Sequence, residues 1–211
     1  MIRCIELRIA TKALRKVRIG EKRNAISNCV CLTGCQDLEG TVEPGGSTLH
    51  VEHARGLTGV ILADNRCRHS ILAGGVDGLV IRGNLVTGRI EGNYDTNTVV
   101  QGNVVRAISA KRPLLQFGFA DGLLIRDNLL VGEVPQQIGV YVWGTSSYDP
   151  KPSRQVSILD NVIRVAGTPV SLNGVQGALI RDNLVEPDAA RPSEVLTKRC
   201  ERVTVVRRDR D

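Results

Sequence analysis

The residues of this chain best suited to ligand binding are its aromatic side chains, which are few and lie close together. Aromatic residues make up 3% of the 211 residues, and every one of them falls between Tyr94 and Tyr148. Tyrosine and tryptophan rings combine an apolar face with a polar atom, which suits the apolar faces and hydroxyl groups of sugars. Tyr94, Tyr141, Trp143 and Tyr148 are therefore candidates for carbohydrate contacts.

Three acidic residues, Glu91, Asp95 and Asp121, occur in and beside the same stretch. Two carboxylates about 5 to 10 Å apart can cleave a glycosidic bond, one as general acid and the other as base or nucleophile. These acids are weak catalytic candidates, because acids at this density are also expected on an ordinary solvated surface.

Two histidines offer a second, weaker possibility for acid–base chemistry. His50 and His69 are 19 residues apart, and Glu52 follows the first of them closely. A His–Glu pair can transfer protons, but nothing else in the sequence converges on this pair, and surface histidines are commoner than catalytic ones.

The cysteines do not indicate a metal site. Cys29, Cys31 and Cys35 are spaced Cys-x-Cys-x3-Cys, whereas structural zinc sites use four ligands in paired, closely spaced sets. We predict no metal and expect cysteines such as Cys67 to fill the core as small apolar residues. The role of the three-cysteine cluster stays open.

The elements that hold these residues are set by a recurring phrase, apolar–x–x–Asn–x–apolar. Good copies surround Asn84, Asn103, Asn128, Asn161 and Asn183, and looser copies surround Asn28 and Asn65. From Asn65 onward the asparagines are 19, 19, 25, 33 and 22 residues apart. A period near 20 residues with variable insertions is typical of a solenoid, in which each coil packs against its neighbours.

Apolar residues alternate around each asparagine, which predicts a short strand on either side of it. We expect positions −5, −3 and +2 to point inward. The asparagine itself is predicted at a tight bend, because asparagine tolerates left-handed backbone and bonds nearby backbone groups. Stacked asparagines can also bond to one another from coil to coil. The strands predicted to complete the coils are 70–73, 89–93, 114–119, 139–143, 169–173 and 194–198.

With these repeats, residues 24–209 resemble the right-handed parallel β-helix family, which includes pectate lyases, polygalacturonases and phage tailspikes. The resemblance implies an all-β solenoid of about eight coils, with three short strands in each coil. We expect a single domain over residues 1–211, with residues 1–22 as an opening coil or N-terminal cap. The catalytic motifs of these enzymes are missing; Thr96-Asn97-Thr98 is only a superficial echo of one of them. A calcium ion is expected only if the chain is a lyase, and no other cofactor is expected.

Alternation along the third strand selects the side chains that face outward there, and two insertions, 107–113 and 144–155, should project beside them. We expect this surface to bind a polysaccharide. The predicted ligand-binding residues are Glu91, Asn93, Tyr94, Gln116, Tyr141, Trp143, Tyr148 and Asn173.

Two further rows of apolar residues, at positions −4 and +1, should also point outward. Exposed apolar patches of this size on a monomer usually mark an interface. We therefore predict a homo-oligomer, by resemblance to tailspikes a trimer, or docking onto a larger assembly. The predicted interface residues are Val80, Leu85, Val99, Val104, Leu124, Leu129, Val162, Leu179 and Leu184.

Composition limits the remaining possibilities. The net charge of +6 is spread along the chain, which argues against a nucleic-acid-binding arm. No apolar run is long enough for a membrane span, and no secretory signal peptide is evident. The sequence leaves the cellular location open. We expect synthesis in the cytoplasm, followed by incorporation into a virion or by release on lysis.

Two functions fit these features. The first is a non-catalytic, glycan-binding or structural β-helix, such as a phage spike or surface component that self-associates. The alternative is a small polysaccharide lyase, hydrolase or epimerase acting on an acidic polysaccharide. The sequence names neither the glycan nor the host, and fold-level analogy supports both functions.

Overall fold

The computed structural model describes residues 24–27, 30–31, 47–50, 58–67, 70–107, 112–145, 149–187 and 195–206. All regular structure in these ranges is β-strand. Accordingly, no helix in the described part of the chain is long and apolar enough to cross a membrane. Several features discussed above lie outside the described residues: the segment 1–22, Cys29, Cys35, His69 and Tyr148.

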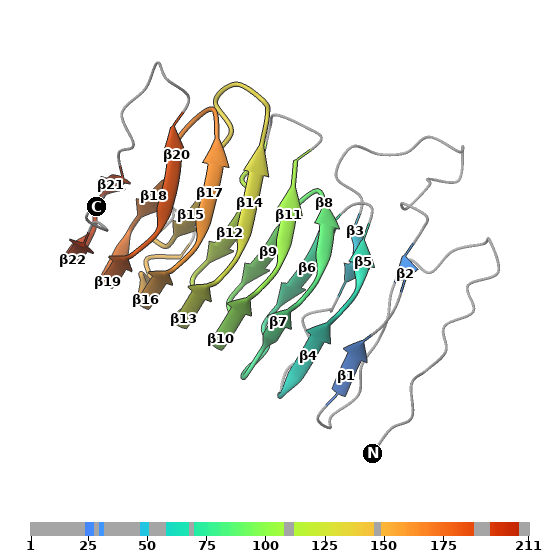
Figure 1. The fold of residues 1–211 in the computed structure, drawn as a ribbon. Helices are drawn as coiled ribbons and strands as arrows, with labels where there is room; N and C mark the ends of the chain where they lie inside the picture. Colours follow the sequence, from blue (N-terminus) through green and yellow to red (C-terminus); the bar gives the residue numbers. More distant parts are fainter. Residues whose placement is uncertain are drawn as a thin grey trace, which may run out of the picture.

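The strands form three parallel sheets that extend side by side along one axis (Figure 1). Sheet 1 contains β1 (Asn24–Ser27), β4 (Val60–Ala63), β7 (Val80–Arg82), β10 (Thr96–Gln101), β13 (Asp121–Arg126), β16 (Ser153–Leu159), β19 (Val175–Arg181) and β22 (Glu201–Val206). Sheet 2 contains β2 (Val30–Cys31), β5 (Arg66–Cys67), β8 (Leu85–Thr87), β11 (Val104–Arg106), β14 (Leu129–Gly132), β17 (Val162–Val165) and β20 (Leu184–Pro187). Sheet 3 contains β3 (Ser47–His50), β6 (Ser70–Gly74), β9 (Ile90–Asn93), β12 (Leu115–Gly118), β15 (Val140–Trp143), β18 (Val170–Asn173) and β21 (Val195–Lys198).

Each coil contributes one strand to every sheet, and each strand pairs only with the equivalent strands of the coils before and after it. The coil β13–β14–β15, for example, pairs with β10–β11–β12 on one side and with β16–β17–β18 on the other. This confirms the predicted all-β, right-handed parallel β-helix with three strands per coil. The eight strands of sheet 1 agree with about eight coils.

The core lies inside the coils and follows the predicted alternation. At position −3, Ile81, Val100, Ile125 and Ile158 are each 0% exposed. At position +2, Val86, Val105, Leu130 and Ile163 are also 0% exposed, and Cys67 is 1% exposed. Stacking the same apolar position from coil to coil therefore makes one continuous hydrophobic core.

The asparagines form a buried ladder between sheets 1 and 2. Asn103 and Asn128 are 0% and 1% exposed, which confirms that they are buried. The amide Nδ2 of Asn103 donates to Oδ1 of Asn128 at 3.0 Å, and Nδ2 of Asn128 donates to Oδ1 of Asn161 at 2.9 Å. The backbone N–H of each asparagine donates to the same neighbouring oxygen.

The left-handed residue of the bend is not the asparagine, contrary to our expectation from the sequence. It is the residue before it, which is glycine or aspartate in each of these repeats, with φ between 54° and 64° for Asp64, Gly83, Gly102, Asp127, Asp160 and Asp182. Glycine and aspartate tolerate this conformation best. The ladder asparagines do not have positive φ, and their amides are directed along the ladder.

Candidate functional site

The outward side chains of β9, β12, β15 and β18 form two rows along the rod on sheet 3, which we call the outer strip. Strand register aligns Glu91, Gln116, Tyr141 and Ser171 in the first row. Register also aligns Asn93, Gly118, Trp143 and Asn173 in the second row. The side chains of the intervening residues are buried, so alternation places the predicted ligand-binding residues of these strands on one face. Equivalent positions of adjacent coils are about 4.8 Å apart.

Glu91 is the centre of a polar network on the first row. Its Oε2 lies 2.8 Å from Nη2 of Arg89, and both side chains are mostly buried, 16% and 14% exposed. Its Oε1 accepts from Nδ2 of Asn93 at 3.3 Å and from Nε2 of Gln116 at 3.4 Å. The carboxylate is thus paired with an arginine and held by two amides, which fixes its position.

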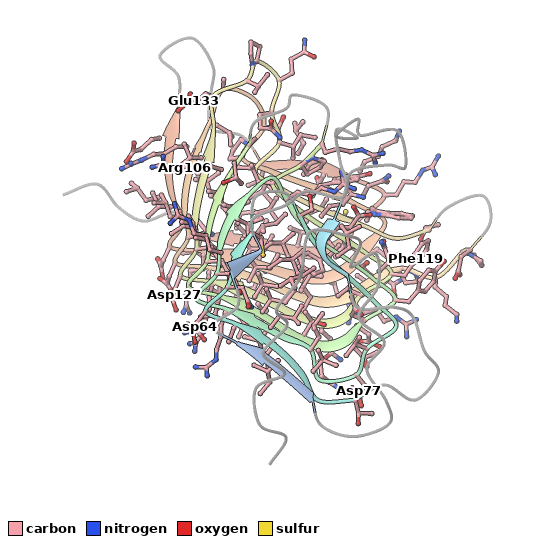
Figure 2. All side chains as sticks on the ribbon, turned by 90° about the vertical axis from the view of Figure 1, so that its right-hand side faces the viewer. Asp64, Asp77, Arg106, Phe119, Asp127 and Glu133 are labelled. Carbon is pink, nitrogen blue, oxygen red and sulfur yellow. The ribbon has the colours of Figure 1, made fainter. Side chains whose placement is uncertain are left out.

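Three aromatic rings form a continuous cluster at the C-terminal ends of β9, β12 and β15. Tyr94 stacks on Phe119 with centroids 4.6 Å apart and an interplanar angle of 10°. Phe119 in turn meets Trp143 in an edge arrangement at 4.5 Å and 68°. Figure 2 shows Phe119 at the outer edge of the coil, away from the asparagine bend marked by Asp64 and Asp127. Tyr94 is 47% exposed, so part of the cluster is open to a ligand.

A glycine makes room for the tryptophan. A Cβ atom added to Gly118 would stand 2.5 Å from Cε2 of Trp143 and 2.5 Å from Oδ1 of Asn93. The indole therefore lies across Gly118 toward Asn93, along the rod axis. Any larger residue at position 118 would push the ring or the amide away.

Three polar atoms of the second row have no hydrogen-bond partner. They are Nε1 of Trp143, Oδ1 of Asn93 and Oδ1 of Asn173, all of them shielded from solvent. A buried tryptophan N–H usually finds an acceptor, and an unpaired buried polar group costs about 1 to 3 kcal/mol. Leaving three such atoms around one indole is a structural cost that calls for a functional explanation.

Backbone strain coincides with this place. Tyr94 and Phe119 have φ of 58° and 51°, a left-handed conformation that is uncommon for bulky side chains. They follow the last residues of β9 and β12, where Gly75 and Gly174 adopt φ of 69° and 67° in other coils. Strain of this kind is concentrated at binding and catalytic sites, because the surrounding scaffold must hold it.

The insertion between β15 and β16 is anchored beside the cluster. Buried Ser153 donates from Oγ to the carbonyl of Trp143 at 2.7 Å and accepts from the N–H of Ala120 at 3.1 Å. The N–H of Thr145 donates to the carbonyl of Lys151 at 2.7 Å. The insertion therefore ends at residue 152, and Arg154, expected within it, belongs to β16.

The acidic candidates lie in three different environments. Glu91 faces the strip, as described above. Asp95 is 1% exposed, and its Oδ1 accepts from the N–H of Val76 at 2.9 Å inside the coil. Asp121 is exposed at the first position of β13. Among the described outward residues of β9, β12, β15 and β18, Glu91 is the only acid.

Sequence reasoning omitted two members of this site, Phe119 and Arg89. The spacing held a signal for Phe119: it follows Tyr94 by 25 residues, the same interval that separates the ladder residues Asn103 and Asn128. Arg89 gave no comparable signal, because the sequence does not reveal which cation will reach Glu91.

The predicted interface rows take their expected positions on the surface. Register aligns Val80, Val99, Leu124 and Leu179 on sheet 1 and Leu85, Val104, Leu129, Val162 and Leu184 on sheet 2. Leu85 and Leu184 are 37% and 40% exposed. The chain turns between these sheets at the asparagine bend, so the two rows lie on different faces of the rod (Figure 2). One flat partner surface therefore cannot cover both rows.

Comparison with known proteins gives a limited result. No protein-family model matches this chain, and no curated protein matches it. Among solved structures, it is similar to DFA-IIIase from Arthrobacter chlorophenolicus A6 in complex with GF2, at 15% identity and a TM-score of 0.39. That alignment covers 90% of this chain and 67% of the other. A cysteine-to-alanine mutant of the same enzyme gives 16% identity, the same coverage and a TM-score of 0.38. At these values the similarity does not bear on the function of this chain.

Proposed function

We propose that this chain binds a polysaccharide along the outer strip without cleaving it. The observation that carries the proposal is the aromatic cluster, whose Tyr94 ring is 47% exposed, beside the amide side chains of Asn93 and Asn173. A sugar offers an apolar ring face beside hydroxyl groups that both donate and accept hydrogen bonds. Such a ligand suits an exposed aromatic ring that lies beside amide side chains.

The arrangement along the rod suits an extended chain of sugars. Asn93, Gly118, Trp143 and Asn173 occupy successive coils, so they are spaced at about 4.8 Å, close to half the length of a sugar unit. A glycan running parallel to the rod axis would meet Asn93 and Asn173 on either side of Trp143. Tyr94, 47% exposed, would extend the contact at one end.

The surroundings of Glu91 favour binding over hydrolysis. Two-carboxylate cleavage needs a second acid about 5 to 10 Å away, whereas the other outward residues of the four strip strands are amides, serine, glycine and aromatics. Glu91 is also paired with Arg89 at 2.8 Å, so its carboxylate is engaged within the chain. A lyase, hydrolase or epimerase remains the alternative, with Asp121 at the neighbouring corner as the second acid.

Tryptophan fluorescence tests the proposal directly, because Trp143 is the only tryptophan in the chain. Titration with a panel of neutral and acidic oligosaccharides should quench or shift its emission for at least one class. Trp143→Ala should abolish binding measured by calorimetry while the unfolding transition is retained. Leu129→Ala, on sheet 2, is a control that should leave the affinity unchanged.

Product analysis separates the two functions. The same panel should yield no new reducing ends and no unsaturated uronates after long incubation with the protein. Cleavage that is lost in Glu91→Gln would favour the enzymatic alternative. The absence of any response of Trp143 to every glycan tested would contradict carbohydrate binding at this strip.

A further inference from the structure

The outer strip carries very little charge, although the chain as a whole has a net charge of +6. Among the outward side chains that the structure describes on β9, β12, β15 and β18, Glu91 is the one charged group. Its carboxylate lies 2.8 Å from Nη2 of Arg89, and both side chains are mostly buried. The negative charge is thus offset within the chain, and the arginine is engaged in doing so. The described strip therefore offers no uncommitted cation to an anionic ligand.

The next cation along the second row of the strip lies beyond these four strands. Lys198 of β21 pairs with Asn173 in the register and is exposed. It is two coils away from Trp143, which corresponds to roughly 10 Å at about 4.8 Å per coil. The carboxylate of an acidic sugar lying over Trp143 would therefore have no cation beside it in this row.

Glu91 also determines the orientation of a neighbouring amide. Nε2 of Gln116 donates to Oε1 of Glu91 at 3.4 Å. A carboxylate oxygen accepts hydrogen bonds, so the NH2 group of Gln116 turns toward Glu91 and its Oε1 turns away. The half-buried Gln116 side chain therefore presents an acceptor atom in the middle of the first row.

Hydroxyl groups continue the first row after this acceptor. Tyr141 and Ser171 follow Gln116 in the register, and both are half-buried. Sugar hydroxyls can donate to an amide oxygen and can exchange hydrogen bonds with other hydroxyls, whereas carboxylate and sulfate groups can only accept. The first row thus suits a ligand that carries hydroxyl groups and no charge.

We propose that the glycan bound by the outer strip is neutral, and that the Arg89–Glu91 pair keeps acidic glycans out. This inference rests on the proposed carbohydrate binding and adds the chemical class of the ligand. A neutral glycan meets amides, hydroxyls and aromatic rings, which is how proteins recognise uncharged ligands. An acidic glycan would bring its carboxylates close to Glu91 without a free cation, and like charges placed together in an interface are strongly unfavourable.

Pairs of oligosaccharides that differ only in charge test the class of ligand. A uronic-acid oligosaccharide and its carboxyl-reduced form share one backbone, and several such pairs can be titrated while the emission of Trp143 and the heat of binding are followed. The neutral member should bind at least about tenfold more tightly. Its affinity should change little between about 0.05 and 0.5 M salt, because its binding forms no ion pair.

Variants of the ion pair test what excludes the acidic member. Glu91→Gln leaves Arg89 without its counter-charge, so the preference for the neutral member should fall by about tenfold, and the affinity gained by the acidic member should decline with salt. Glu91→Gln/Arg89→Gln removes both charges and should bring the preference back toward that of the unmodified chain. A purely structural role of the pair would lower both affinities together and leave their ratio unaltered.

Lys198→Gln is the control for a more distant cation. This exposed change should leave the fold and the affinity for the neutral member as they are, with folding checked by circular dichroism and thermal unfolding. Tighter binding of the acidic member, an unaltered ratio in folded Glu91→Gln, or loss of binding in Lys198→Gln would each overturn this inference while leaving carbohydrate binding intact. If Glu91→Gln does not fold, the matched oligosaccharides still decide the class with the unmodified chain. Failure of Trp143 to respond to any glycan would overturn both proposals.

Discussion

The asparagine ladder and the outer strip both carry amide side chains in register along the rod, yet these amides differ greatly in their hydrogen bonding. In the ladder, Nδ2 of Asn128 lies 3.0 Å from the carbonyl of Val100 and 2.9 Å from Oδ1 of Asn161, and its own Oδ1 accepts two bonds from Asn103. In the strip, Oδ1 of Asn93 and Oδ1 of Asn173 accept none.

This difference distinguishes an amide that stabilises the fold from one that is available to a ligand. A buried, fully bonded amide lowers the free energy of the folded state and also specifies the stacking register, because a shifted coil would leave its bonds unmade. An amide with an unmade bond is a cost to folding, and the bond becomes a gain when a partner arrives. The ladder therefore stabilises the fold, and the strip is the surface for which we propose recognition.

Removing a ladder amide should have the largest effect on stability. Asn128→Ala deletes both the donor and the acceptor that bridge Asn103 and Asn161, and it leaves the carbonyl of Val100 without this donor. We expect a loss of about 1 to 3 kcal/mol in the free energy of unfolding, measured by urea denaturation.

The strip supplies the control for that measurement. Asn93→Ala removes a part-buried amide of the same type, which makes one side-chain hydrogen bond, to Glu91, and it should cost clearly less than Asn128→Ala. Equal losses for the two variants would show that the hydrogen bonds of the ladder are not what distinguishes these regions.

Gly118→Ala should have the next largest effect, and it acts on the strip. The new methyl group would stand 2.5 Å from Trp143 and from Asn93, so the indole must move. We expect a shift in the emission of Trp143, weaker glycan binding and a stability loss of about 1 kcal/mol.

Gly74→Ala is the matched control, since Gly74 occupies the same row and pairs with Asn93 in the register. Its added Cβ would meet the carbonyl oxygen of Asn93 at 3.3 Å and reach no aromatic ring. The emission of Trp143 should therefore stay as in the unmodified chain. A Gly118→Ala variant with unaltered emission would contradict the packing of the indole over this glycine.

Asn173→Ala should change stability by less than about 0.5 kcal/mol, because its side-chain oxygen Oδ1 makes no hydrogen bond that could be lost. Its affinity for a glycan should nevertheless fall. Comparing chemical denaturation with calorimetric titration of the same variant separates the two quantities. A stability loss as large as that of Asn128→Ala would place Asn173 with the structural amides.

The sequence was sufficient to predict the fold because every coil of a solenoid repeats the same residue pattern. Each coil restates the inward apolar positions around its asparagine, so errors in one repeat, such as the weak copy at Asn28, do not affect the others. The asparagine bend was identified for the same reason. Its left-handed residue could also have been read, since glycine or aspartate precedes the asparagine in every good copy.

The site was only partly predictable, because its contacts depend on details that do not repeat. Alternation placed Asn93, Tyr141, Trp143 and Asn173 on the outer face. It could not reveal that the indole lies across Gly118, that Arg89 neutralises Glu91, or that Asp95 turns into the coil. Each of these contacts depends on the rotamer of a single side chain, which a periodic pattern does not predict.

The smallest expected effect concerns acid stability, to which the uncharged ladder cannot contribute. At the corner between sheets 3 and 1, labelled at Asp77 in Figure 2, a carboxylate takes the place of an amide in a coil-to-coil contact. Oδ1 of Asp77 accepts from Oγ1 of Thr96 at 2.7 Å and from Nδ2 of Asn97 at 2.8 Å, and these bonds lower the pKa of Asp77 below its usual 3.8. A lowered pKa means that the unfolded chain binds the proton more readily. The contribution of Asp77 is therefore fully present above about pH 4 and is lost as the pH falls through the lowered pKa.

Asp77→Asn should accordingly lose less stability than the unmodified chain when the pH is lowered from 7 to about 2.5, a range that crosses the usual pKa of aspartate. Thr96→Val removes the first of the two donors, so it should shift the acid-sensitive range of Asp77 back toward the usual pKa. Thermal unfolding followed by circular dichroism across this pH range measures both effects, and the high exposure of Asp77 keeps them small. Identical pH profiles for the three proteins would mean that this carboxylate is merely solvated. In that case the side chains of the corner would resemble neither the fully hydrogen-bonded amides of the ladder nor the unpaired amides of the strip. The acid sensitivity of the chain would then have to arise from other carboxylates.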